Sequence, residues 1–182
     1  ICLMDDLKSI DFRIRICIQF VCVFASLSLI QIPTEIYNFI PMKILQISMI
    51  FLWIYLINIH NFLDGVDGML TINTIFISSI IILESFFSNK IYFSTILSIF
   101  LLGSCLSFLF FNFPKAKLFL GDTGSIFLGY IIGLIFLENI FYQNFFLAFS
   151  IIFYVFIDMT LTLSKKIIKG KKQIAYDIFG VS

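Results

Sequence analysis

Charged residues are scarce in this sequence, and their scarcity is the first constraint on its fold. Only 13% of the 182 residues are charged, whereas a water-soluble domain usually carries about 25%. The hydrophobic fraction is 60%, the mean hydropathy is +1.08, and 25 residues are Phe. The net charge of +1 gives no signature of nucleic-acid binding. We therefore expect an integral membrane protein surrounded by lipid, with no nucleic-acid partner, whose few charged side chains carry the function.

Other absences narrow the fold class. No apolar segment shows the strict two-residue alternation of a barrel strand, and each is too long for one, so α-helices must satisfy the backbone in lipid. The four cysteines have no metal-type spacing, and we interpret them as small buried side chains. No repeat or linker-like stretch divides the chain. We expect an all-α fold, in which residues 1–182 form one polytopic bundle of membrane helices.

Six apolar stretches are long enough to cross a bilayer, given some tilt. They are residues 16–32, 44–59, 72–87, 91–111, 123–141 and 145–163. The second and third are short as written, and the fifth spans the bilayer only if Glu138 lies near an interface. Six spans place both ends of the chain on the same side of the membrane.

Lysine and arginine residues sort strongly between the two sides of the expected bundle. With the segment before the first span in the cytoplasm, ten of these twelve residues lie in cytoplasmic segments and two lie on the other side. The ten are Lys8, Arg13, Arg15, Lys115, Lys117, Lys165, Lys166, Lys169, Lys171 and Lys172, and the two are Lys43 and Lys90. This distribution agrees with the positive-inside rule.

The acidic residues sort as well, although acids contribute little to orientation. Every Asp lies in a cytoplasmic segment or toward the cytoplasmic end of the last span, whereas Glu35, Glu84 and Glu138 lie at or near the other side. The aspartates are Asp5, Asp6, Asp11, Asp64, Asp67, Asp122, Asp158 and Asp177. Their gathering predicts a functional site on the cytoplasmic face. Asp158 is the exception, because we interpret it first as a helix-packing residue and second as a site residue.

The first acidic motif is the adjacent pair Asp5 and Asp6. Successive residues of a helix cannot point the same way, so one carboxylate faces a site while the other binds backbone or a basic partner such as Lys8. An ordinary acidic helix start explains the pair equally well, because the helix dipole favours Asp there. The pair is a weak signal by itself.

The second motif is NIHNFLDGVDGML, residues 58–70. Asn58, Asn61 and Asp64 recur every three residues, and Asp67 follows at the same interval, so a continuous helix through them carries a polar stripe. A calcium-binding EF-hand loop is the alternative, but the stretch lacks the required acidic spacing and the distal Glu. We interpret His60 as an interfacial residue without a catalytic role.

The third motif is FLGDTGSIFLGY, residues 119–130. Asp122 lies between two glycines, and Thr123 and Ser125 are able to cap the helix that follows, so a plain N-cap is one interpretation. Free amides at a helix start also attract phosphate, and a neighbouring carboxylate can hold Mg²⁺. Taken together, the three motifs favour diphosphate chemistry that depends on a divalent cation.

The order of these motifs resembles a known family. The pair DD, then NxxNxxDGxDGM, then NFPKAKLFLGDTGSxxLG, separated by hydrophobic spans, is similar to the polyprenyl-phosphate sugar-1-phosphate transferases of the glycosyltransferase family 4 type. The resemblance runs from Asp5 to about Lys172, and IDMTLTLSKKIIKGKK resembles the branch that initiates O-antigen and related glycans. It implies Mg²⁺-dependent transfer of a HexNAc-1-phosphate from a UDP-sugar to undecaprenyl phosphate, with release of UMP. The implied location is the bacterial inner membrane, with the active site facing the cytoplasm, and a homodimer stays open.

The resemblance also implies roles for individual residues. Asp5 and Asp6 match the catalytic acidic pair, one of which deprotonates or orients the lipid phosphate. Asn61 and Asp122 match positions linked to Mg²⁺. The residues that match nucleotide-sugar-binding positions are Asp64, Gly65, Asp67, Asn112 and Phe119. We expect the lipid phosphate to attack directly, with a covalent Asp intermediate as the alternative.

The sequence departs from the family pattern at both ends. Family members carry further helices before the acidic pair and a His-containing cytoplasmic motif after the lysine cluster, whereas this sequence has no histidine after His60. Because it also begins with Ile, we expect a fragment of a longer protein. Two other hypotheses stay open, namely a truncated remnant without catalytic activity and a small multi-pass transporter, although no paired broken helices support the transporter.

Overall fold

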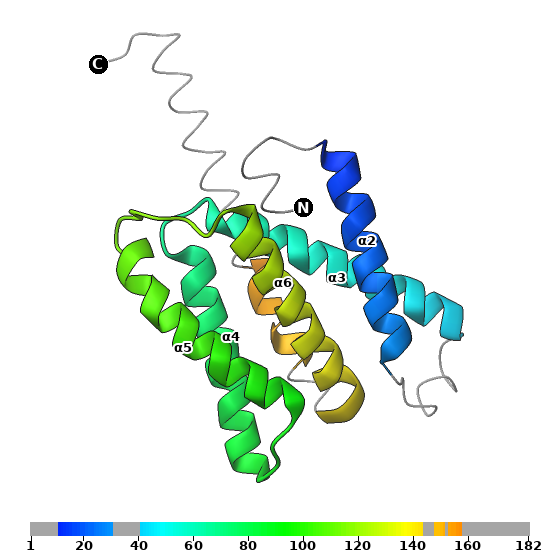
Figure 1. The fold of residues 1–182 in the computed structure, drawn as a ribbon. Helices are drawn as coiled ribbons and strands as arrows, with labels where there is room; N and C mark the ends of the chain where they lie inside the picture. Colours follow the sequence, from blue (N-terminus) through cyan, green and yellow to red (C-terminus); the bar gives the residue numbers. More distant parts are fainter. Residues whose placement is uncertain (1–10, 31–40, 144–147, 152, 158–182) are drawn as a thin grey trace.

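The described part of the chain is a bundle of α-helices (Figure 1). The computed structural model describes residues 11–30, 41–143, 148–151 and 153–157. The helices are α2 (Phe12–Leu29), α3 (Met42–Asp64), α4 (Met69–Ser88), α5 (Phe93–Asn112), α6 (Gly121–Glu138) and the short π-helix η2 (Asn139–Gln143). A further apolar helix covers Ala148–Ile157, apart from residue 152. The expected all-α fold class is confirmed.

Four of the described helices are long and apolar enough to cross a membrane. They are Met42–Asp64, Met69–Ser88, Phe93–Asn112 and Gly121–Phe141, which correspond to the second to fifth predicted stretches. The predicted first stretch corresponds to α2, and much of the sixth lies outside the described residues. The second stretch was predicted too short, because α3 continues beyond residue 59 to Asp64 and therefore contains most of the polar motif.

Helices α3 and α6 pack closely because two glycines of α6 face α3. A Cβ atom on Gly129 would lie 2.8 Å from the backbone Cα of Ile57, and one on Gly133 would lie 2.1 Å from Trp53 Cδ1. Trp53 is 1% exposed, and its indole nitrogen donates to the carbonyl of Tyr130 at 2.9 Å. Small residues at such crossings are how membrane helices approach one another without a hydrophobic driving force. This packing holds the end of α3 against the start of α6.

Helices α4 and α5 pack side by side, and both bury small polar side chains. The buried ones include Thr74, Ser78 and Ser85 on α4 and Ser94 and Ser98 on α5. Large apolar side chains point outward instead, and Phe86, Phe100 and Phe110 are 75%, 71% and 82% exposed. An apolar exterior around a partly polar interior is what a helix bundle in lipid requires.

Asp64 and Asp122 of the second and third motifs lie with Arg15 at one end of the bundle, in the upper part of Figure 1, where α2 and α6 begin and α3 ends. At the other end, the Glu138 carboxylate accepts a hydrogen bond from the Phe93 amide at 3.1 Å. Glu138 therefore caps the start of α5, and its position at a membrane interface stays a prediction. Among the cysteines, Cys105 is buried as predicted, whereas the prediction was wrong for Cys17 and Cys22, which are exposed on α2.

Candidate functional site

Asp64, the last residue of α3, binds the start of α6. Its carboxylate accepts hydrogen bonds from the backbone amides of Leu120 at 3.2 Å and Gly121 at 2.8 Å. Leu120 is the N-cap residue of α6 and makes no capping hydrogen bond with its own side chain. The interpretation of Thr123 and Ser125 as N-caps is therefore wrong, because the capping oxygens come from another helix. The negative carboxylate also suits the positive end of the α6 dipole.

Asn61 lies one turn before Asp64 and also faces α6. Its side-chain oxygen accepts a hydrogen bond of 2.6 Å from Ser125 Oγ, which lies 2.7 Å from the Gly121 carbonyl. Ser125 is fully buried, so this contact holds the Asn61 amide in one orientation. Ser125 follows Asp122 by about one turn of α6, so Asn61 of α3 contacts α6 one turn beyond Asp122.

Asp122, in the first turn of α6, forms an ion pair with Arg15 in the first turns of α2. Each side chain is 24% exposed, so the pair lies at the edge of the bundle and is open to water on one side. The sequence assigned Arg15 only to membrane orientation. No pattern in the sequence relates residues 107 positions apart, and this partner was therefore missed.

The polar stripe does not continue as predicted. Helix α3 ends at Asp64, with Gly65 as its C-cap, so Asp67 lies in the following loop with its side chain exposed. Gly68 closes this loop at φ +71°, and a Cβ there would lie 2.7 Å from Phe113 Cδ2. The loop of Gly65 and Asp67 therefore contacts the segment that follows α5, whereas the Asp67 carboxylate is open to water.

The other two polar residues of the second motif have packing partners. Asn58 donates a hydrogen bond of 2.9 Å to Gln19 on α2, so it joins α2 to α3. His60 is fully buried beside Gly129, and its Nδ1 lies 2.7 Å from the Leu56 carbonyl, so its side chain packs between α3 and α6. Helix α6 covers the face of α3 that carries His60. The spacing of residues within α3 does not reveal this contact.

Asn112 and Phe119 lie at the two ends of the loop between α5 and α6. Asn112 is 1% exposed, accepts from Thr71 Oγ1 at 2.9 Å, and donates to the Leu118 carbonyl at 2.8 Å. It thus ties this loop to the start of α4. Phe119 is 51% exposed, and the next residue, Leu120, is bound through its amide to Asp64. The aromatic ring is therefore accessible on a loop whose backbone is anchored.

The acidic pair Asp5 and Asp6 lies outside the described residues, as do Asp158 and the lysine cluster. The catalytic role of Asp5 and Asp6 stays a prediction. The structure brings together Asn61, Asp64 and Asp122, with the loops of Asp67 and Phe119 alongside.

The oxygen atoms at this junction fit a hard divalent cation. Asp122 and Asn61 supply carboxylate and amide oxygens, whereas both carboxylate oxygens of Asp64 bind backbone amides. Within the described ranges, no three His, Cys, Asp or Glu side chains form a metal-binding group. Mg²⁺ is usually held by one or two carboxylates together with water and substrate phosphates, so a site of this kind does not need a third acidic ligand.

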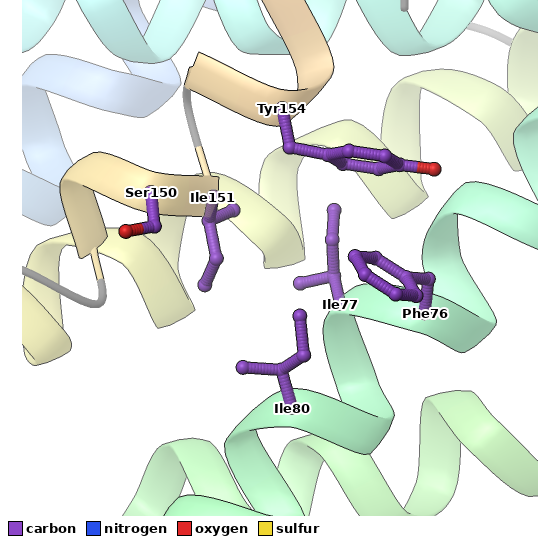
Figure 2. Close-up of a pocket in the computed structure, with 6 residues that line it drawn as sticks. All are labelled: Phe76, Ile77, Ile80, Ser150, Ile151 and Tyr154. Carbon is purple, nitrogen blue, oxygen red and sulfur yellow. The ribbon is translucent and has the colours of Figure 1, made fainter.

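A separate apolar cavity of about 390 Å³ lies between α4 and the helix at 148–157 (Figure 2). It is lined by Phe76, Ile77, Ile80, Ser150, Ile151 and Tyr154. The rings of Phe76 and Tyr154 pack with their centroids 4.6 Å apart. Because its lining contains no acidic or basic side chain, this cavity lacks the groups for phosphate chemistry.

Comparison with known proteins identifies the family of this chain. The chain is 37% identical over 92 residues to the phospho-N-acetylmuramoyl-pentapeptide-transferase of Pelagibacter ubique, a match that covers 43% of this chain and 26% of the relative. It is 40% identical over 85 residues to a Bacillus subtilis protein described as "Probable undecaprenyl-phosphate N-acetylglucosaminyl 1-phosphate transferase", covering 46% and 24%. Each match spans about a quarter of the relative. No solved structure matches the chain. The family model of glycosyl transferase family 4 matches residues 1–140, so the predicted resemblance is confirmed and the chain belongs to this family.

Proposed function

We propose that this protein transfers a HexNAc-1-phosphate from a UDP-sugar to undecaprenyl phosphate and releases UMP. An oxygen of the lipid phosphate attacks the phosphorus next to the sugar, the phosphoanhydride bond to UMP breaks, and a new phosphoanhydride joins the lipid to the sugar phosphate. The product begins the synthesis of a cell-envelope glycan, of the O-antigen type according to the residues after the last span. The relatives named above include transferases for two sugar phosphates, so the sugar itself is part of the proposal.

One observation carries this proposal. Three segments far apart in the sequence meet at one end of the bundle, through the contacts Asp64 to Gly121, Asn61 to Ser125 and Arg15 to Asp122. Phosphoryl transfer asks mainly for positioning and charge stabilisation, and this junction supplies fixed polar groups at a membrane surface. A transporter path has no equivalent reason to gather these residues at one end.

Each residue has a task in the proposed reaction. Asn61 and Asp122 hold Mg²⁺, which neutralises charge on the diphosphate when it is bound. Asp64 keeps the loop before α6 in place through the amides of Leu120 and Gly121. The exposed ring of Phe119 receives the uracil base. Asp5 and Asp6 deprotonate or orient the lipid phosphate.

The distribution of basic residues supports a cytoplasmic site in the inner membrane. Arg13 and Arg15 begin α2, and Lys115 and Lys117 lie in the loop between α5 and α6, all at the end that carries Asp122. Lys43 and Lys90 lie at the starts of α3 and α5, toward the opposite end. Donor and acceptor phosphates therefore meet on the cytoplasmic side.

A transfer assay tests the proposal. Membranes that contain the protein are incubated with Mg²⁺, undecaprenyl phosphate and UDP-GlcNAc labelled in the sugar, and the label in the lipid phase is measured. We expect lipid-linked label with the native chain and none with Asp122→Asn. Asp11→Asn is the matched control, because Asp11 lies at the same end, caps α2 by accepting from the Arg13 amide, and Asn is an equally good N-cap. Label that stays in water with the native chain contradicts the proposal, and so does undiminished transfer by Asp122→Asn.

A further inference from the structure

We infer that Arg15 is a positioning residue whose guanidinium competes with the divalent cation for the Asp122 carboxylate. The inference rests on the proposed function, because it assigns the cation to Asp122. In the described structure the positive charge beside Asp122 comes from Arg15 on α2. When the cation binds, Arg15 leaves this carboxylate and becomes available to an anionic group of the donor.

The location of Asp122 supports an exchange of positive charges. Asp122 lies in the first turn of α6, where the helix dipole stabilises a negative side chain. Its carboxylate and the Arg15 side chain are each 24% exposed, so a hydrated cation has access from water. A divalent cation and a guanidinium on the same carboxylate repel each other, and the repulsion is strong where water is partly excluded. This repulsion favours the departure of one of the two positive charges.

Of the described carboxylates that contact the start of α6, Asp64 is not equivalent to Asp122. Both Asp64 oxygens accept backbone amides that hold the start of α6, so releasing Asp64 means losing the cap of that helix. Releasing Arg15 costs much less, because α2 keeps other contacts with the bundle. Gln19 accepts from Asn58 at 2.9 Å, and Val23 and Leu27 are buried in the core. Arg15 is therefore the movable partner.

Arginine suits binding to an anionic group of the donor as well as the ion pair with Asp122. Its planar guanidinium binds carboxylate and phosphate oxygens with the same fork of donors. A donor that arrives with Mg²⁺ brings phosphate oxygens to this place, and a released Arg15 is already at the site. The exchange couples occupation of the cation site to binding of the donor.

Binding of Mn²⁺ to the purified chain in detergent, followed by the electron paramagnetic resonance signal of free Mn²⁺, tests this inference without any turnover. Arg15→Gln removes the competing charge, and Arg13→Gln is the control, because Arg13 is exposed in the same turn and its loss changes the net charge equally. We expect Arg15→Gln to bind Mn²⁺ about five- to tenfold more tightly than Arg13→Gln. Arg15→Met is a second neutral variant with the same expected gain, in case the Gln variant does not fold.

The outcomes separate this inference from the proposed function. Asp122→Asn should lose the Mn²⁺ site in either case. If Asp122→Asn loses the site but the Arg15 variants bind Mn²⁺ no more tightly than Arg13→Gln, the competition is wrong and the cation assignment stands. If the native chain and all Arg variants fail to bind Mn²⁺, the cation assignment is wrong and the inference falls with it.

Discussion

Asp64 at the end of α3 and Gly121 at the start of α6 are joined by a hydrogen bond of 2.8 Å from the Gly121 amide to the Asp64 carboxylate. The two residues are 57 positions apart, yet the oxygen of one completes the helix that begins at the other. A residue that the sequence assigns to the nucleotide-sugar site thus also has a structural task. Stability and activity are therefore measured separately for this residue.

Replacing Asp64 should destabilise the bundle. Asp64 is 6% exposed and accepts two backbone amides. Hydrogen bonds to charged groups contribute about 1.5–3 kcal/mol each, so we expect Asp64→Ala to lower the free energy of unfolding by about 2–4 kcal/mol. Asp64→Asn keeps one acceptor oxygen and should lose about half as much. Unfolding by SDS in mixed micelles measures this, followed by the fluorescence of the single, buried Trp53.

Asp67 is the matched control for Asp64. It has the same chemistry three residues further along, but it is exposed in the loop after α3. We expect Asp67→Asn to change the free energy of unfolding by less than about 0.5 kcal/mol. A loss from Asp67→Asn as large as that from Asp64→Asn contradicts the assignment of the capping role to Asp64.

The close crossing of α3 and α6 predicts a second effect on stability. An Ala methyl at Gly129 would meet the Ile57 backbone at 2.8 Å, and backbone cannot rotate away as a side chain can. We expect Gly129→Ala to lower the free energy of unfolding by about 1–3 kcal/mol. The measurement is again SDS unfolding.

Gly103 on α5 controls for the general effect of replacing glycine in a helix. A Cβ at Gly103 meets nothing within 4 Å, so Gly103→Ala adds no clash and is expected to stabilise the helix slightly. If the two Ala variants change stability in the same direction by the same amount, the crossing at Gly129 is not as tight as the geometry indicates.

Much of this architecture could be predicted from composition and motif order. Long uncharged stretches indicate membrane helices, and four of them match described helices to within a few residues. Positive residues orient the bundle, and the aspartates of the second and third motifs then fall at one end. The placement of Asn61 and Asp122 at the same end of the bundle follows from this orientation and the family motif.

The side-chain partners could not be predicted, because they depend on which helix face meets which. Asn58, Asn61 and Asp64 form one stripe in the sequence, but they contact Gln19 on α2, Ser125 on α6 and the backbone before α6. Because α3 packs against both α2 and α6, the three side chains of the stripe contact different partners. The burial of His60 and the pairing of Arg15 with Asp122 have the same cause.

Loss of the Ser125 hydroxyl is expected to impair the use of Mg²⁺ specifically. Its hydroxyl holds the Asn61 oxygen at 2.6 Å, so Ser125→Ala leaves that amide free to rotate. Partners of metal ligands typically contribute 10–100-fold to metal affinity. We expect the Mg²⁺ concentration for half-maximal transfer to rise about tenfold, with a much smaller change in kcat at saturating Mg²⁺.

Ser107→Ala is the control for Ser125→Ala. Ser107 is exposed on α5 and bonds to the Gly103 carbonyl within its own helix. The Mg²⁺ dependence of transfer by Ser107→Ala should match that of the native chain. An equal fall of kcat at every Mg²⁺ concentration for Ser125→Ala points to damage of the fold instead of a loosened metal ligand.

Phe119 predicts a change in donor binding without a change in stability. Its ring is 51% exposed, so truncation removes little packing, and the neighbouring Leu120 amide keeps the loop anchored to Asp64. Stacking of a base on an aromatic ring contributes about 1–3 kcal/mol, so Phe119→Ala should raise the KM for the UDP-sugar at least about fivefold. Phe119→Trp should keep the KM near the native value. Phe110→Ala removes an aromatic ring that is 82% exposed on the outside of α5, and it should leave the KM unchanged. Equal KM values for Phe119→Ala and Phe110→Ala would show that the uracil base binds elsewhere.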